Sequence, residues 1–383
     1  MRYVLVTETY PPEVNGVALT VHGLACGLRA RGHAVCVVRP RQPADAARPH
    51  DADELRLPGA PLPRYPGLRF GLPAATRLRR AWRACRPDAV YVATEGPLGA
   101  SALRAAKALD IPVATGFHTR FDRYMRDYGL PWLAPVAWRW MRRFHDGADA
   151  TLVPTAELAS ELQRAGVRRV LRLPRAVDTA LFDPRWRDET LRAGWGARPQ
   201  GPVVLHVGRI APEKNLELAV RAFRALQRHR PQARMVWVGD GPARARLQRA
   251  HPDFVFCGVQ RGEALARHFA SGDLFVFPSR SETFGNVTLE AMASGVATVA
   301  FDTGAAREHL ADGKHGHVVR DGDEAAFVEA TVALGCDDAR REAMGWAARA
   351  AAAALDPAHV AAAFDRLLQR LADGRTHAAP AVA

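Results

Sequence analysis

The stretch that most constrains the fold of this chain runs from residue 273 to residue 301 and contains two short apolar runs. Residues 274–277 and 296–301 are mostly apolar and rich in β-branched and aromatic residues, which is typical of buried strands, and the segment between them has the length and composition of a helix. The stretch therefore predicts a βαβ unit. Because ligands bind at the carboxyl ends of the strands in an open parallel sheet, we expect residues 279–286 to lie where chemistry is done.

The loop of this unit carries polar groups that suit a phosphorylated ligand. We expect Glu282 to project from the loop, and Phe284, Gly285 and Asn286 to present free backbone N–H groups at the start of the helix. Such groups favour an anion such as phosphate. Glu290 follows eight residues after Glu282, so both carboxylates are able to face one site. The alternative is a pair of solvated surface carboxylates.

The pattern Glu282-x-Phe284-Gly285-x-x-x-Leu289-Glu290 resembles the signature of the retaining glycosyltransferases of family 4. The resemblance implies that Glu282 holds a hydroxyl of the donor sugar. It implies that the backbone at Phe284 and Gly285 meets the diphosphate, with Asn286 beside it, and that Glu290 holds the ribose hydroxyls.

Three further segments of the carboxyl-terminal half match the same family. Arg209 and Lys214 bracket a helix start after the strand 203–207, within a Gly-Arg and Glu-Lys-Asn pattern whose bases hold the diphosphate in the family. Surface ion pairing is the alternative role for these two cations. Gly239 and Gly241 form a glycine turn compatible with close approach of a nucleotide. Val259 lies where the family meets the base, but no acidic residue follows until Glu263, so the base is left open.

The amino-terminal half contributes two matches. Asn15 and Gly16 lie between a strand and a helix, where an ordinary turn is one interpretation and approach of backbone amides to the donor diphosphate is the other, implied by the resemblance. His118 follows the strand 112–115. A lone histidine is more often structural, but the family has a histidine in this loop that reaches the donor sugar.

Strands and helices alternate along the chain, with a Pro-rich segment at 40–73 that we expect to be irregular. The resemblance implies the GT-B fold, in which two doubly wound, Rossmann-like α/β domains face one another across a cleft. We expect an acceptor-binding domain over residues 1–174, a linker over 175–202 and a nucleotide-sugar-binding domain over 203–355. A final helix over 356–372 is expected to cross back to the first domain.

The net charge of +13 is concentrated in residues 1–172, which carry 26 basic and 15 acidic residues. Residues 64–144 contain 15 basic and five acidic residues, and basic and apolar residues alternate from residue 120 to 144. This composition suits a helix at an anionic membrane surface. The alternative is that the aromatic residues pack in the core or line an acceptor pocket. The apolar members are Phe121, Tyr124, Met125, Tyr128, Trp132, Leu133, Trp138, Trp140 and Met141, and the basic members are Arg120, Arg123, Arg126, Arg139, Arg142 and Arg143.

The five cysteines have no paired spacing, so neither a disulfide framework nor a metal site is indicated, and we expect no metal or other cofactor. No apolar run approaches the length that spans a bilayer. The sequence therefore predicts a cytoplasmic protein, with peripheral attachment to the inner face of the cell membrane as a further expectation.

We interpret the chain as a glycosyltransferase that moves a hexosyl unit, with mannosyl favoured, from a nucleotide-diphosphate sugar to a lipid-linked or other glycan acceptor with retention. The alternatives are a UDP-glucose-dependent glucosyltransferase and an epimerase or phosphorylase of the same fold. A nucleic-acid-binding protein is the non-enzyme alternative, from the pI near 10.3. No nucleic-acid-binding motif accompanies the charge, so we expect no nucleic-acid partner.

Overall fold

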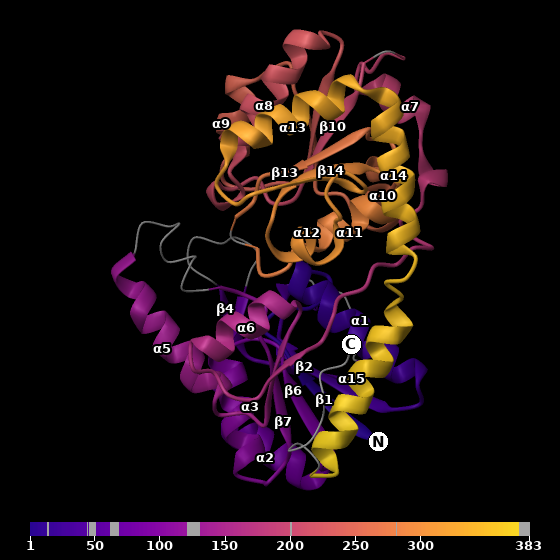
Figure 1. Cartoon of the computed structure of the whole chain (residues 1–383). Coiled ribbons are helices and arrows are strands. Elements are labelled where there is room, and N and C mark those ends of the chain that lie inside the picture. Colours follow the sequence, from indigo (N-terminus) through magenta and orange to yellow (C-terminus); the bar gives the residue numbers. More distant parts are fainter. Residues whose placement is uncertain are drawn as a thin grey trace. The chain divides into compact units, whose positions relative to one another are not determined.

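The computed structural model describes residues 1–13, 15–43, 45, 51–61, 69–120, 131–199, 201–280 and 282–374 of the chain. These residues form two compact units (Figure 1). The first consists of the residues up to Arg175 together with the segment that begins at Pro357, and the second is Ala176–Asp356. Each unit is built on a parallel sheet covered by helices, so the prediction of two α/β domains is confirmed.

The first unit contains a seven-stranded parallel sheet in the order β3-β2-β1-β6-β7-β8-β9. Successive side chains of a strand point to opposite faces of the sheet. β1 therefore supplies Tyr3 and Leu5 to the core on one face and Val4 and Val6 to the core on the other. The order reverses between β1 and β6, which is the position where doubly wound sheets bind ligands. The strands are Arg2–Val6 (β1), Ala34–Pro40 (β2), Glu54–Leu57 (β3), Ala89–Val92 (β6), Val113–Gly116 (β7), Ala150–Val153 (β8) and Val170–Arg172 (β9).

Helices cover both faces of this sheet because each has an apolar stripe at helical spacing. In α1, for example, Val21, Leu24 and Leu28 are buried at intervals of three and four residues. The helices of this unit are Gly16–Ala30 (α1), Ala75–Ala84 (α2), Pro97–Lys107 (α3), Ala134–His145 (α5), Ala156–Arg164 (α6) and Pro357–Ala372 (α15).

The expectation of an irregular segment over residues 40–73 is wrong in part. The segment supplies the edge strand β3 and an antiparallel hairpin of β4 (Gly59–Pro61) and β5 (Arg69–Gly71). β3 is attached to β2 by backbone pairing, by the buried Arg39 of β2, which lies 2.7 Å from Glu54, and by Leu57, which is buried in the core. The strand has only four residues and lies in a Pro-rich segment, which is why the sequence did not indicate it.

The last helix, α15, belongs to the first unit and runs alongside α1 (Figure 1). Close contact needs a small residue, since a Cβ on Gly27 would lie 2.4 Å from the Cβ of Ala361. The carboxylate of Asp365 is 1% exposed and accepts hydrogen bonds from Arg31, His33 and Tyr3. These bonds offset the cost of burying a charge on this helix.

The second unit contains a six-stranded parallel sheet in the order β12-β11-β10-β13-β14-β15, which reverses between β10 and β13. Its strands are Val203–Val207 (β10), Arg234–Val238 (β11), Val255–Gly258 (β12), Leu274–Phe277 (β13), Ala297–Phe301 (β14) and Gly316–Val319 (β15). Its α-helices are Glu189–Gly194 (α7), Leu216–His229 (α8), Arg244–Ala250 (α9), Gly262–Ala270 (α10), Asn286–Ala293 (α11), Gly304–His309 (α12), Glu324–Cys336 (α13) and Asp338–Ala352 (α14).

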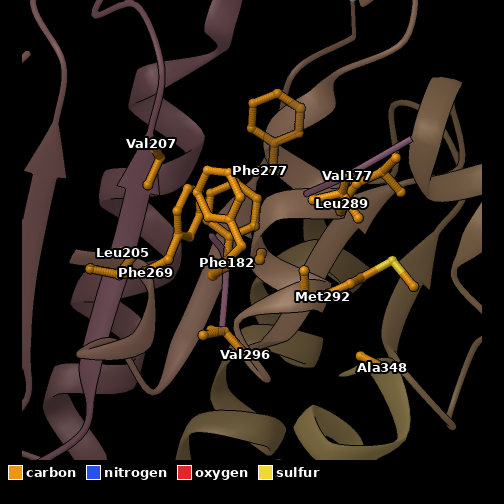
Figure 2. Packing of buried hydrophobic residues seen from close by; sticks show 14 of the residues in the cluster. Val177, Phe182, Leu205, Val207, Phe269, Phe277, Leu289, Met292, Val296 and Ala348 are labelled. Atoms are coloured by element: carbon orange, nitrogen blue, oxygen red, sulfur yellow. The ribbon is translucent and has the colours of Figure 1, made fainter. Parts of the chain in front are cut away.

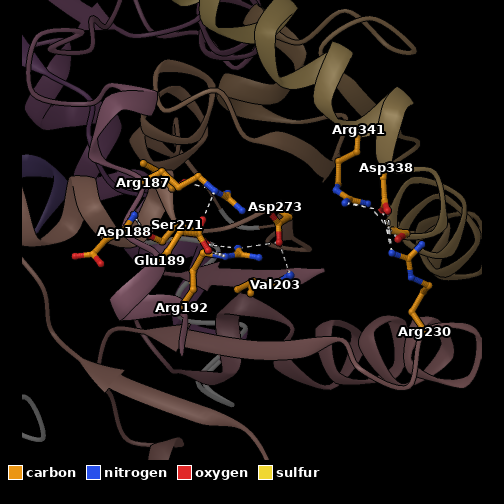
Figure 3. Close-up of polar contacts among 12 residues, drawn as sticks. Arg187, Asp188, Glu189, Arg192, Val203, Arg230, Ser271, Asp273, Asp338 and Arg341 are labelled. Atoms are coloured by element: carbon orange, nitrogen blue, oxygen red, sulfur yellow. Dashed lines mark hydrogen bonds and ion pairs between the residues drawn. The ribbon is translucent and has the colours of Figure 1, made fainter. Parts of the chain in front are cut away.

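Of the predicted linker, residues 175–202, Arg175 belongs to the first unit and the described residues from Ala176 onward pack into the second. Val177 and Phe182 lie in its core, where the ring of Phe182 meets that of Phe269 edge-on at 5.9 Å (Figure 2). The carboxylate of Asp273 accepts a hydrogen bond of 2.9 Å from Arg192 and one of 2.7 Å from the backbone N–H of Val203 (Figure 3). The segment therefore has both an apolar and an ionic attachment to this unit.

No helix in the described part of the chain is both long and apolar enough to cross a membrane.

Candidate functional site

The predicted βαβ unit exists, and its loop lies at the reversal point of the second sheet. The chain leaves β13 at Phe277 and enters α11 at Asn286. The loop after β10, which runs through a 3-10 helix at Pro212–Lys214, ends at the start of α8. Because β10 and β13 are hydrogen-bonded neighbours and parallel, their two carboxyl-terminal loops meet at the same edge of the sheet.

Two of the predicted site residues, one from each loop, contact one another directly. The ammonium group of Lys214 forms an ion pair with the carboxylate of Glu282. Ser279 also donates a hydrogen bond of 2.9 Å to Glu282, and the Lys214 ammonium lies 5.7 Å from the centre of the Phe277 ring. Burial alone would raise the pKa of Glu282, but the charge and hydrogen bond of Lys214 and the Ser279 hydroxyl lower it below its ordinary value.

Arg209 also has a carboxylate neighbour in its own loop. Its guanidinium lies 3.7 Å from Glu213, whose side chain is 1% exposed, while the side chain of Arg209 is 33% exposed. Both predicted diphosphate ligands are therefore paired with carboxylates, yet Arg209 keeps an exposed side from which to meet an anion.

The glycines of the neighbouring loop allow two backbone segments to touch. A Cβ on Gly239 would lie 1.9 Å from the carbonyl oxygen of Gly208, and one on Gly241 would lie 2.4 Å from that of Ile210. The N–H of Ile210 donates to the carbonyl of Asp240 at 2.9 Å. The structure thus gives these two glycines a packing role, in addition to the nucleotide approach that the sequence suggests.

The start of α11 depends on the left-handed conformation of Gly285, which has a φ of +88° and provides no side-chain cap. In the described part of the chain, no capping side chain accepts a hydrogen bond from the N–H groups of the first turn, although the N–H of Thr288 donates to the carbonyl of Gly285 at 3.1 Å. Phe284 itself is buried, and its carbonyl accepts a hydrogen bond of 2.6 Å from Ala305. Its side chain and carbonyl are therefore structural, and its N–H is the group left for a ligand.

Glu290 lies in the second turn of α11, and burial raises its pKa to about 7. Across the residues that the structure describes, no cation pairs with its carboxylate.

Val259, the residue predicted near the base, is 50% exposed in the loop after β12, and β12 is two strands away from β10. Val259 therefore follows a different strand from the two, β10 and β13, whose loops carry Lys214 and Glu282.

The remaining predicted residues belong to the first unit. Asn15 caps α1, accepting a hydrogen bond of 2.9 Å from the N–H of Ala18 and donating one of 2.6 Å to Thr9. Gly16 is the first residue of that helix. The side chain of Asn15 thus has a structural role, so the donor contact predicted at this position would come from the backbone.

His118 follows β7 and has partners on both ring nitrogens. Its Nε2 lies 2.7 Å from the hydroxyl of Tyr91, and its Nδ1 lies 2.6 Å from the guanidinium of Arg175. Burial, and next the charge of Arg175, lower the pKa of His118 well below its ordinary value. Tyr91 and Arg175 are residues that the sequence analysis missed, because neither lies in the segment that contains His118.

His206 is also missed by the sequence analysis, whereas Ser279 begins the predicted loop 279–286, without a role assigned to its hydroxyl. His206 lies inside β10 with 0% exposure, its Nδ1 is 3.2 Å from the carbonyl of Val276, and burial lowers its pKa to about 4. A histidine in a run of valines and leucines was the only signal available. Among the described residues, no cluster of three or more His, Cys, Asp or Glu side chains could hold a metal ion.

Comparison with known proteins supports the same interpretation. Residues 14–181 match the profile of Glycosyltransferase Family 4, and residues 201–337 match that of Glycosyl transferases group 1. A GDP-mannose-dependent alpha-mannosyltransferase of Mycolicibacterium smegmatis is 39% identical over 91% of this chain and 92% of its own length. One of the same description from Mycobacterium tuberculosis is 38% identical over 80% of this chain and 81% of its own length.

Solved structures agree on the fold. The sucrose-phosphate synthase of Thermosynechococcus elongatus superposes with a TM-score of 0.79 at 20% identity, covering 97% of this chain and 99% of its own. HepE of Anabaena, solved with UDP, superposes with a TM-score of 0.75 at 18% identity over 96% of this chain and 100% of its own. Both units thus have the Rossmann-like sheets of the GT-B fold, and the chain belongs to glycosyltransferase family 4.

Proposed function

We propose that this glycosyltransferase moves a mannosyl residue from GDP-mannose to a lipid-linked acceptor with retention of the anomeric configuration. The observation that carries the proposal is the contact between Lys214 and Glu282 at the reversal point of the second sheet. It places a cation, suited to a diphosphate, beside a carboxylate, suited to a sugar hydroxyl. A nucleotide sugar presents these two groups next to one another.

The charges of the site suit departure of a nucleoside diphosphate. Arg209, Lys214 and the uncapped start of α11 are positive groups that stabilise the negative charge developing on the leaving diphosphate. We infer that they do so without a metal ion or other cofactor. Glu282 is held by an ion pair and a hydrogen bond and is therefore placed to orient a donor hydroxyl rather than to attack the sugar.

Positioning and leaving-group stabilisation are then the main sources of catalysis. We propose transfer on one face of the sugar: the bond to the diphosphate oxygen breaks, the acceptor oxygen bonds to the anomeric carbon, and the departing phosphate takes the acceptor proton. Glu290, whose carboxylate has no cation partner in the described part of the chain, is proposed to accept hydrogen bonds from the ribose hydroxyls.

The preference for GDP-mannose rests on the relatives with 38% and 39% identity that are described as using it. UDP-glucose is the second candidate donor, because the loop at Val259 supplies no carboxylate that would recognise guanine. A lipid acceptor is supported by other relatives. One is a GDP-mannose-dependent alpha-(1-6)-phosphatidylinositol monomannoside mannosyltransferase of Mycolicibacterium smegmatis, 31% identical over 90% of this chain and 92% of its own.

A surface of the first unit suits such an acceptor. Val136 and Trp140 are 57% and 50% exposed, and their spacing of four residues places them on one side of α5. Trp132, in the 3-10 turn that precedes α5, is 69% exposed. Arg139, Arg142 and Arg143 of the same helix are exposed. We propose that this surface meets an anionic membrane. Met141 of the same helix is buried, so the alternative of core packing holds for this residue. The aromatic and basic residues that the sequence analysis named between 121 and 130 lie outside the described residues.

The decisive experiment offers the purified chain GDP-mannose, GDP-glucose, UDP-glucose and UDP-galactose in separate thermal-shift titrations. The true donor raises the melting temperature with the logarithm of its concentration above the dissociation constant. Its transfer to lipid extract, followed by NMR of the product's anomeric proton, tests retention. Addition of EDTA without loss of activity supports metal independence. A shift with UDP-glucose alone would replace the mannosyl proposal, and release of a sugar phosphate or an epimer would assign the chain to another GT-B reaction.

A further inference from the structure

The loop after β7 holds His118 between two fixed partners in the first unit. The hydroxyl of Tyr91, which is 1% exposed in β6, lies 2.7 Å from Nε2, and Nη2 of Arg175 lies 2.6 Å from Nδ1. Gly116 permits this arrangement. A Cβ at that position would lie 2.1 Å from the Tyr91 hydroxyl and 2.5 Å from Nε2 of His118.

The chemistry of Arg175 decides which nitrogen carries the imidazole proton. A guanidinium has only N–H donors and remains charged in proteins, so Nδ1 of His118 accepts the hydrogen bond through its lone pair. The single proton of the neutral ring then resides on Nε2, which donates to the oxygen of Tyr91. A doubly protonated ring would place an N–H of His118 against an N–H of Arg175.

We propose that Arg175 is a positioning residue that holds His118 in its neutral, Nε2-protonated form, with the Nε2–H donated to Tyr91, so that His118 never acts as a proton acceptor in the transfer. The identity of that transfer rests on the proposed function. The tautomer itself depends only on the contacts within the first unit.

The other groups around His118 act in the same direction. Burial disfavours the charged ring, and the charge of Arg175 and then that of His145 lower its pKa further. His145 is itself 3.1 Å from the carboxylate of Glu95 and 2.9 Å from the hydroxyl of Thr115. Tyr91 is the remaining titratable group at the ring, and burial raises its pKa, so it stays neutral. We therefore expect no titration of His118 between pH 5 and pH 8.

The test is ¹⁵N NMR of the full chain with labelled histidine, in which the signals absent from His118→Gln identify His118. We expect the pattern of a neutral ring protonated at Nε2, unchanged from pH 5 to pH 8. Arg175→Lys, which keeps a charged donor, should preserve this pattern. Arg175→Met should give a mixture of the two neutral tautomers, because Nδ1 no longer accepts a hydrogen bond from a fixed donor while burial still disfavours the charged ring. Tyr91→Phe should leave the proton on Nε2, because Arg175 still occupies Nδ1.

Arg169→Met is the matched control, since Arg169 is exposed and pairs with Asp149. A protonated Nδ1, or titration of His118 near pH 6.5 in the unaltered chain, would overturn the inference. So would an unchanged pattern in folded Arg175→Met. With the donor identified, Arg175→Met should lower kcat about tenfold and Arg175→Lys should restore most of it, with KM for the donor changed less. The NMR experiment uses no donor, so its result does not depend on which sugar is transferred. Failure of GDP-mannose transfer would therefore count against the proposed function and not against the assignment of the His118 tautomer.

Discussion

The ammonium group of Lys214 and the carboxylate of Glu282 form an ion pair although 68 residues separate them in the chain. They are brought together because β10 and β13 are adjacent in the sheet while their loops are far apart in sequence. The pair also couples the proposed role of Lys214 at the diphosphate to that of Glu282 at the sugar, because a change in either residue removes the ion-pair partner of the other.

The first prediction concerns the two cations. Lys214→Met and Arg209→Met should each lower kcat by about a hundredfold, because a charge that stabilises the leaving diphosphate is worth on the order of 3 kcal/mol. Steady-state kinetics at saturating donor measures the effect. Arg246→Met is the control, since Arg246 pairs with Glu217 at a site where both side chains are 71% exposed. Unchanged turnover in a folded variant would remove that cation from the mechanism.

The second prediction separates the two glutamates. Glu290→Gln should weaken binding of GDP about tenfold, since a hydrogen bond to a charged group contributes roughly 1.5 to 3 kcal/mol. Glu282→Gln should impair use of the sugar donor and change GDP binding little. Isothermal titration with GDP and with GDP-mannose distinguishes the two variants. Equal losses of GDP affinity in both would show that the division of roles is wrong.

The third prediction follows from the pKa of Glu290, which burial raises to about 7. A carboxyl group whose pKa is higher in the folded than in the unfolded protein stabilises the folded state below its ordinary pKa of 4.5. This contribution to the free energy of unfolding is lost as the pH rises through 7. The ribose contact has the opposite dependence, because it uses the ionised form. Affinity for GDP-mannose, whose diphosphate does not titrate in this range, should rise between pH 6 and pH 8. Glu290→Gln should abolish that rise, and a rise of equal size in the variant would assign it to another group.

The fourth prediction concerns stability of the second unit. Asp273→Asn should destabilise it by about 3 kcal/mol, because Arg192, 7% exposed, loses its largely buried carboxylate partner and is left with the exposed Glu189. Glu217→Gln breaks an exposed pair and should cost less than about 1 kcal/mol. Urea unfolding of both variants gives the comparison. Similar small effects would mean that the attachment of residues 176–202 rests on its apolar contacts.

The fifth prediction tests the exposed surface of α5. The chain should pellet with vesicles that contain anionic lipid, and binding should fade as salt is added. Replacing Arg139, Arg142 and Arg143 together by Gln should weaken it, and replacing Trp132 and Trp140 by Ala should weaken it at all salt concentrations. Arg228→Gln, in the second unit, is the control. Absence of binding to anionic vesicles at low salt would favour an acceptor that is not membrane-bound.

Much of the fold could be predicted from the sequence because strands and helices of both units alternate with clear apolar runs. The strand Leu274–Phe277 and the helix that begins at Asn286 were both predictable, since β-branched and aromatic residues stand on one side of a Pro-Ser turn and helix formers on the other. The edge strand Glu54–Leu57 was not, because it has only four residues and lies in a Pro-rich segment.

The sequence by itself also indicated which loops carry the candidate site, because the spacing from Glu282 to Glu290 and the cations Arg209 and Lys214 are local features of the chain. Only the tertiary structure decided how those residues are paired. The contact of Lys214 with Glu282 depends on strand order, and that of His118 with Tyr91 and Arg175 joins three segments that are distant in sequence. Local spacing records periodicity and turn chemistry, whereas hydrogen bonds and charge pairs between loops arise only when the sheet brings the strand ends together.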